Sequence, residues 1–219
     1  MKTKGSAAEV VFRETIARLR KCDGDTAFKL VKADNQAALA VLRTKDLWMI
    51  RPTPMPNKRA GTLVLVTTAI RWHEDVALAA LDDKEIREGR VSASSGTIIA
   101  AIAVKYHVEA GIKALDDREI YSLRVHGNNY TDSWTVAHFA VNSFKAVARY
   151  ALEHRDSKEI CALTTSLERT NPQTVGELAI NKLGLDWKPT SRVIDEIAKK
   201  YNMAEEDKAQ LFALRRKSD

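Results

Sequence analysis

The sequence Leu81-Asp82-Asp83-Lys84-Glu85-Ile86 returns nearly unchanged as Leu115-Asp116-Asp117-Arg118-Glu119-Ile120. A diverged third copy reads Asp156-Ser157-Lys158-Glu159-Ile160. The recurrence of this motif along the chain indicates a stack of similar helical units. In such a stack each unit buries its apolar faces only against its neighbours. We expect the aspartates to cap a short helical turn that directs each isoleucine back onto the stack.

A threonine marks the start of each predicted unit. The threonines are about 36, 35, 38 and 39 residues apart, at Thr26, Thr62, Thr97, Thr135 and Thr174. A threonine hydroxyl can accept a hydrogen bond from an unpaired backbone N–H at the start of a helix. We therefore predict that each threonine is the N-cap or a first-turn residue of the first helix of its unit.

Two short helices fit within each unit. Apolar residues recur with helical spacing through an opening segment, residues 7–21, and then through paired segments. The first helices of the pairs are predicted over residues 28–32, 63–72, 98–106, 136–142 and 175–183. The second helices are predicted over residues 36–42, 75–81, 109–115 and 145–152.

The composition agrees with an all-α fold. Hydrophobic residues make up 45% of the chain and aromatic residues only 6%, with alanine and leucine dominating the apolar positions. Such a mixture favours closely packed helices over a β-sandwich. The predicted architecture is a solenoid of helical hairpins.

The unit resembles the ankyrin repeat. Thr135-Val136-Ala137-His138-Phe139-Ala140 is similar to that family's Thr-Pro-Leu-His-x-Ala first helix, and His73-Glu74-Asp75-Val76 and His107-Val108-Glu109-Ala110 are similar to its second. The sequence lacks the family's proline, and Trp72 and Tyr106 stand where the family has glycine. The resemblance covers roughly residues 23–183 and implies an ankyrin-like solenoid. A two-helix solenoid of the HEAT kind is the alternative.

Three regions are predicted along the chain. Residues 1–22 form an N-terminal capping helix, residues 23–186 the ankyrin-like repeats, and residues 187–219 a C-terminal helical cap. Residues 49–59 hold three of the five prolines and are basic, so they form a non-helical connection. A projecting connection of this kind either carries function or serves only as a spacer.

The bulk properties exclude several classes of protein. The net charge is +6, with a sequence pI of about 9.3, and the positive excess lies in the N-terminal segment, around residues 43–59 and at residues 215–217. The excess is modest and no nucleic-acid motif accompanies it. No apolar run is long enough to cross a bilayer, and residues 7–21 are too charged for a secretory signal. Cys22 and Cys161 have neither disulfide-framework nor zinc spacing. We expect a cytoplasmic protein that does not associate with membranes.

The five histidines are the first candidates for catalysis. His73 and His107 hold equivalent positions in the repeat, and we expect them to begin second helices and bind backbone groups there. His138 is expected to bond to Thr135 across one helical turn. No metal, nucleotide or nucleophile motif is present, so neither a cofactor nor an enzyme is predicted.

Recognition is the function that the sequence favours. Repeat arrays commonly bind other macromolecules, and aromatic and arginine residues dominate binding hot spots. The candidate partner-binding residues are those types on predicted loops: Trp48, Arg51, Tyr121, Arg124, His126, Tyr130 and Trp134. Packing of Tyr130 and Trp134 against a neighbouring repeat is the alternative for those two.

The leading prediction is a non-catalytic protein-interaction module whose oligomeric state is open. The first alternative is a nucleic-acid-associated protein that binds phosphates through its basic segments, in particular Lys58, Arg59, Arg215, Arg216 and Lys217. A second alternative is an enzyme on a helical scaffold that uses His107, His138 or His126.

Overall fold

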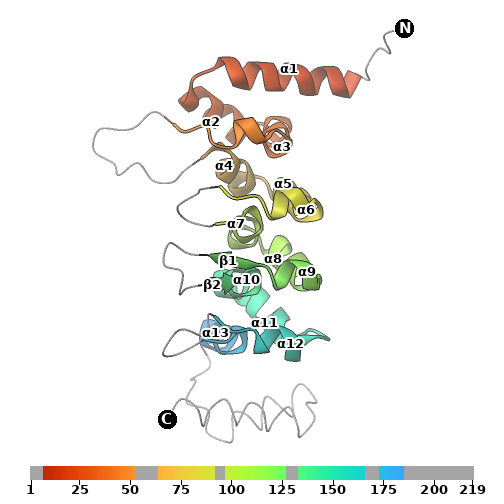
Figure 1. Cartoon of the computed structure of the whole chain (residues 1–219), viewed down its shortest axis with the longest axis vertical. Helices are drawn as coiled ribbons and strands as arrows, with labels where there is room; N and C mark the ends of the chain where they lie inside the picture. The colour runs from red at the N-terminus through yellow and green to blue at the C-terminus, as the bar shows by residue number, and fades with distance from the viewer. Residues whose placement is uncertain (1–6, 53–63, 92–96, 127–132, 166–172, 185–219) are drawn as a thin grey trace, which may run out of the picture.

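Helices follow one another along the long axis of the molecule in the computed structural model, which describes residues 7–52, 64–91, 97–126, 133–165 and 173–184 (Figure 1). The opening helix α1 (Ala7–Lys21) agrees with the predicted bounds. Its Leu19 is buried, and Phe12 and Ile16 pack against the core above α3. Residues 53–59 of the predicted connection 49–59, and the whole predicted C-terminal cap, 187–219, lie outside the described residues.

Pairs of antiparallel helices make up most of the remaining fold, and we call each pair a layer. The layers are α2 (Gly24–Ala33) with α3 (Asn35–Arg43), α4 (Leu65–Trp72) with α5 (Glu74–Asp82), α7 (Ile99–Tyr106) with α8 (Val108–Leu115), and α10 (Val136–Ser143) with α11 (Lys145–Glu153). Helix α13 (Val175–Leu183) follows them. The helices predicted from apolar periodicity are therefore present.

Each layer packs chiefly on the layers before and after it. The first helices contact one another in the order α2, α4, α7, α10 and α13, and the second helices in the order α3, α5, α8 and α11. Figure 1 shows both series running down the long axis. The first helices carry much of the core, and in α7 every residue from Ile99 to Val104 is buried.

Short helices follow the second helix of successive layers. They are the 3₁₀ helix η1 (Lys45–Leu47), α6 (Lys84–Arg87), α9 (Arg118–Tyr121) and α12 (Ser157–Ala162). Asp83 accepts from the Ile86 N–H at 3.1 Å, and Asp117 accepts from the Glu119 N–H at 2.8 Å. Ile86, Ile120 and Ile160 are buried. The predicted capping turn is confirmed in the two close copies, whereas Asp156 in the third makes no side-chain cap.

Extended segments connect successive layers, on the side away from the short helices (Figure 1). Strands β1 (Arg124–His126) and β2 (Ser133–Thr135) are antiparallel, with Val125 opposite Trp134. Single bridges join Arg90 to Ile98 and Thr164 to Thr174. An equivalent backbone hydrogen bond recurs at 2.9–3.0 Å, from Leu65 to Ile50, Ile99 to Gly89, Val136 to Leu123 and Val175 to Leu163.

The threonine prediction is only partly correct. Thr135 and Thr174 are N-caps, and the Thr174 hydroxyl accepts from the Glu177 N–H at 3.0 Å. Asp23, not Thr26, caps α2, and Ile98, not Thr97, stands at the N-cap of α7. Thr26 lies in the first turn of α2, as the prediction allowed, and its hydroxyl donates to Asp23, so the prediction fails only at Thr97 among the described threonines. Thr62 lies outside the described residues.

Close packing between layers depends on small residues. A Cβ atom at Gly111 in α8 would lie 2.8 Å from the Val147 side chain in α11. Ala101, Ala103 and Ala140 are buried in the first helices, in agreement with the close helix packing expected from the composition. Among the described residues, no helix is both long and apolar enough to cross a membrane.

Candidate binding surface

Two aromatic residues predicted to lie exposed on loops are buried instead. Trp48 is 5% exposed, its indole N–H donates to the Leu42 carbonyl at 3.0 Å, and a Cβ at Gly89 would lie 2.6 Å from its ring. Tyr121 is 2% exposed, and burial raises the pKa of its hydroxyl. The expectation of exposure at both residues was wrong, because Trp48 directly follows η1 and Tyr121 ends α9, and both side chains pack into the core.

The other predicted partner-binding residues differ in their position and exposure. Arg51 and Arg124 are exposed on the edge formed by the extended segments. His126 ends β1, and Trp134 in β2 is half-buried, with its ring 5.2 Å from that of Phe139. The candidates Tyr130, Lys58, Arg59, Arg215, Arg216 and Lys217 lie outside the described residues.

A different set of aromatic residues is exposed at the ends of the first helices. Trp72 ends α4 and is 55% exposed, and Tyr106 ends α7 and is half-buried. Lys32 Nζ lies 5.1 Å from the Trp72 ring centre, and the Arg71 guanidinium carbon lies 5.2 Å from that of Tyr106. Lys105 Nζ also lies 5.7 Å from the Tyr106 ring. We call these residues the cation–aromatic row: Lys32, Arg71, Trp72, Lys105 and Tyr106.

The row arises from matching positions near the ends of three first helices. Lys32, Arg71 and Lys105 each stand in the last turn of a first helix, where a cation interacts favourably with the helix dipole. The cation of the preceding layer lies over the ring of each aromatic residue, Lys32 over Trp72 and Arg71 over Tyr106. A cation–π contact of this kind contributes about 0.5–1 kcal/mol at exposed sites. The sequence carried a signal for this surface, since Trp72 and Tyr106 replace the glycine of the ankyrin pattern.

Histidines join successive layers directly behind the row. The Nε2–H of His73 donates to the Val31 carbonyl at 2.7 Å, and the Nε2–H of His107 donates to the Ile70 carbonyl at 2.6 Å. Both residues are N-caps of second helices. Both histidines begin second helices as predicted, but each ring binds a carbonyl of the preceding layer and makes no side-chain cap at the start of its own helix.

His138 is the most deeply buried histidine among the described residues, with no exposed surface. Its Nδ1 accepts from the Thr135 N–H at 3.2 Å and lies 2.7 Å from the Thr135 hydroxyl, as predicted. Its Nε2 donates to the Gln173 carbonyl at 3.3 Å. Burial lowers the pKa of His138 to about 4, so the ring is neutral at physiological pH.

A cluster around Asp116 was missed in the sequence. The Asp116 carboxylate accepts from the Tyr150 hydroxyl at 2.6 Å and from His154 Nε2 at 3.1 Å. The other ring nitrogen of His154 accepts from the Asp156 N–H at 3.0 Å. Lys113 makes the corresponding contact with Asp82 one layer earlier, at 2.6 Å. Nε2 of His154 therefore joins two layers, whereas Nδ1 binds the local backbone, and the sequence offered no signal for the contact with Asp116.

Charged residues of the short helices form a ladder between layers. Lys45 pairs with Glu85 at 3.0 Å, Arg87 with Glu119 at 2.9 Å, and Arg118 with Glu159 at 2.6 Å. Each glutamate comes from a copy of the motif that opens the sequence analysis. The charges on this edge of the stack are thus largely paired, in contrast to those of the cation–aromatic row.

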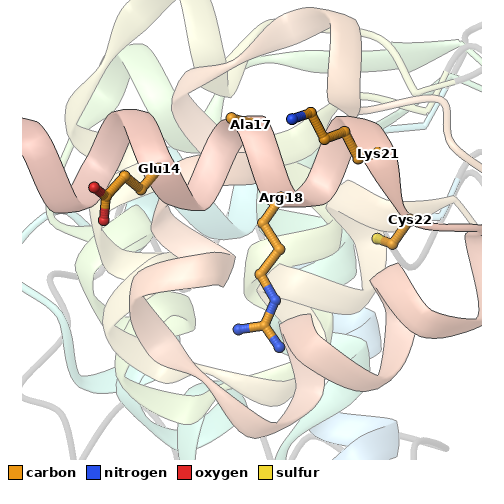
Figure 2. Close-up of a pocket in the computed structure, with 5 residues that line it drawn as sticks. All are labelled: Glu14, Ala17, Arg18, Lys21 and Cys22. Carbon is orange, nitrogen blue, oxygen red and sulfur yellow. The ribbon is translucent and has the colours of Figure 1, made fainter.

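An open depression of about 470 Å³ lies beside α1. Its lining is Glu14, Ala17, Arg18, Lys21 and Cys22, and Figure 2 shows Glu14 at one end and Lys21 and Cys22 at the other. The Cys22 thiol donates to the Leu19 carbonyl. Burial raises the pKa of the second thiol, Cys161, to about 12. In the described part of the chain, no three histidine, cysteine or acidic side chains are grouped to hold a metal ion.

Comparison with known proteins found no match: no protein-family profile, no curated protein sequence and no solved structure aligns significantly with this chain.

Proposed function

We propose that the chain is a non-catalytic protein-interaction module, built as a solenoid of ankyrin-like repeats and acting in the cytoplasm. The proposal of a repeat solenoid is supported by contacts that recur from layer to layer. The His73 bond to Val31 recurs as the His107 bond to Ile70, and the Lys32–Trp72 contact recurs as Arg71–Tyr106. Stability in such an array comes mainly from contacts between neighbouring units.

The exposed side chain of Trp72 is the observation that carries the proposed interaction. Trp48 and Tyr121 are used within the fold, whereas Trp72 leaves 55% of its surface in water beside further aromatic and cationic groups. Tryptophan, tyrosine and arginine are the residue types most enriched in binding hot spots. A surface of this composition is typical of protein recognition.

The absence of catalysis in this proposal rests on how the histidines are used. His107 and His138 were the candidate catalytic groups, yet a backbone carbonyl occupies the Nε2 of each ring. His138 is also fully buried and cannot meet a substrate without local unfolding. Their hydrogen bonds are better suited to joining layers than to proton transfer.

Capture followed by reconstitution tests the proposed function. The full chain is immobilised, captured proteins are identified, and each is purified and titrated against the chain by calorimetry. We expect a saturable complex of defined stoichiometry that survives Met49→Ala and Arg149→Ala, which remove exposed side chains outside the row. Failure of every purified candidate to bind would contradict the proposed function.

A further inference from the structure

The cations of the row have no carboxylate partner in the described part of the chain. Lys32, Arg71 and Lys105 are all exposed, and none of them forms an ion pair there. Their contacts are with aromatic rings. The row therefore presents one uncompensated positive charge in each of three consecutive layers, with α2, α4 and α7 as its supports.

Three carboxylates at the starts of the second helices that follow the row already have partners within the stack. Asp34 accepts from the Gln36 N–H at 2.8 Å and caps α3, and Asp75 accepts from the Asn35 amide. The Glu74 carboxylate lies 3.7 Å from the His107 ring. These acids follow the row on the starts of the second helices, so the positive strip has a negative border on one side.

We infer that the cation–aromatic row binds an acidic peptide segment of a protein partner, with an apolar side chain placed against Trp72. This inference rests on the proposed interaction function and specifies its site and chemistry. Carboxylates spaced along an extended peptide can pair with Lys32, Arg71 and Lys105 in turn. Charge complementarity of this kind favours association and fixes the register of the bound segment.

A polyphosphate chain suits the same surface less well. Single-stranded nucleic acid needs free aromatic faces for its bases and a groove of uniform positive charge. Here Glu74, Asp75 and Glu109 lie exposed in the first turns of the following helices, so acidic groups interrupt the positive charge along the row. Discrete carboxylates on a peptide can avoid those acids, whereas a continuous phosphate backbone cannot.

A display library of random 12-residue peptides, selected against the full chain, tests the inference. The expected result is enrichment of sequences that combine several Asp or Glu residues with one large apolar residue. One enriched peptide is then labelled and its affinity for each variant is measured by fluorescence anisotropy. Loss of a hot-spot tryptophan typically weakens binding at least about 30-fold, so we expect this for Trp72→Ala.

The charged residues supply a second, independent series. Arg71→Ala and Lys105→Ala should each weaken binding about two- to fivefold, because exposed ion pairs contribute modestly. Arg71→Glu with Lys105→Glu should abolish binding of the acidic peptide and allow binding of its Lys-substituted version. Met49→Ala and Arg149→Ala should leave the affinity within about twofold, as expected for sites with no shared contact. These charge variants test the binding surface even if Trp72→Ala does not fold.

The other outcomes separate the inference from the proposed function. Enriched peptides that bind the row variants as tightly as the original chain would overturn the row as the site, while the interaction function would stand. Enriched peptides without acidic residues would overturn the stated chemistry. A library that yields no binder would count against both. Binding of a 12-nucleotide oligothymidine that is lost in the row variants would replace the peptide by nucleic acid.

Discussion

Trp48 and Trp72 are the same residue type in neighbouring layers, and the protein uses them in opposite ways. Trp48 follows η1, is 5% exposed, and has its indole N–H bonded to the Leu42 carbonyl. Trp72 ends α4, is 55% exposed, and contacts the Lys32 ammonium group through its ring. The first side chain is explained by the fold. The second is only partly used within the fold, and its exposure is the observation on which the proposed interaction rests.

The largest expected loss of unfolding free energy follows from removing Trp48, the buried tryptophan of this pair. Trp48→Ala removes a ring packed against Gly89 and leaves the Leu42 carbonyl without its donor. Truncation of a buried tryptophan costs about 3–5 kcal/mol of unfolding free energy. Urea denaturation followed by circular dichroism measures this change. A loss below about 1 kcal/mol would contradict the role of Trp48 as a core residue.

The buried histidine should make stability depend on pH. The pKa of His138 is about 4 in the folded chain and 6.5 for the solvated ring of the unfolded chain, so the unfolded chain binds a proton first as the pH falls. The stability from neutral His138 is complete above pH 6.5 and is lost toward pH 4, a total of about 3 kcal/mol. Unfolding free energies measured by urea denaturation from pH 7.5 to pH 4 test this.

His138→Gln is the matched control for the pH experiment. Glutamine at this position can accept from the Thr135 N–H, as Glu177 accepts from the Thr174 N–H at 2.6 Å three residues into α13. Glutamine does not titrate, so the variant should lose about 3 kcal/mol less than the original chain between pH 6.5 and pH 4. Equal pH dependence of the two proteins would show that His138 is not the group responsible.

The capping aspartates provide a smaller test within the repeated motif. Asp117→Ala removes the acceptor for the Glu119 N–H and should cost about 1 kcal/mol. Asp156→Ala should have less effect on the cap, because Asp156 makes no side-chain cap. Comparison of the two unfolding free energies tests whether the motif stabilises its short helix through the aspartate. An equal loss in both variants would contradict this.

The sequence predicted the elements well and their surfaces poorly. Helix positions follow from local apolar spacing, which explains why residues 7–21 and the later pairs were correctly placed. The close contacts of His138 were also predictable, since Thr135 lies one helical turn away. The burial of Trp48 and Tyr121 was not predictable, because it depends on how the short helices pack against the next layer.

Contacts between layers explain the remaining differences. Asp116 meets Tyr150 and His154 across an interval of 34 and 38 residues, and nothing local in the sequence marks these pairs. The same is true of Lys32 and Trp72. Alignment of the repeats by their histidines, in contrast to their threonines, places Trp72 and Tyr106 at equivalent positions. That register would have brought the cation–aromatic row to attention from the sequence.

The exposed member of the tryptophan pair should matter least for stability. Trp72→Ala loses one cation–π contact and a partly buried ring, so the expected change in unfolding free energy is about 1 kcal/mol or less. Urea denaturation beside Trp48→Ala gives the direct contrast. A loss as large as that of Trp48→Ala would mean that Trp72 is primarily a structural residue.

A titration of the ¹⁵N-labelled full chain with the selected acidic peptide tests the central contrast most directly. The indole N–H signals of Trp48 and Trp72 are assigned from the Trp48→Phe and Trp72→Phe variants. We predict that the Trp72 signal shifts saturably with peptide concentration, while the Trp48 signal, held by the Leu42 carbonyl, keeps its position. An unchanged Trp72 signal at saturating peptide would contradict the assignment of the cation–aromatic row as the binding surface.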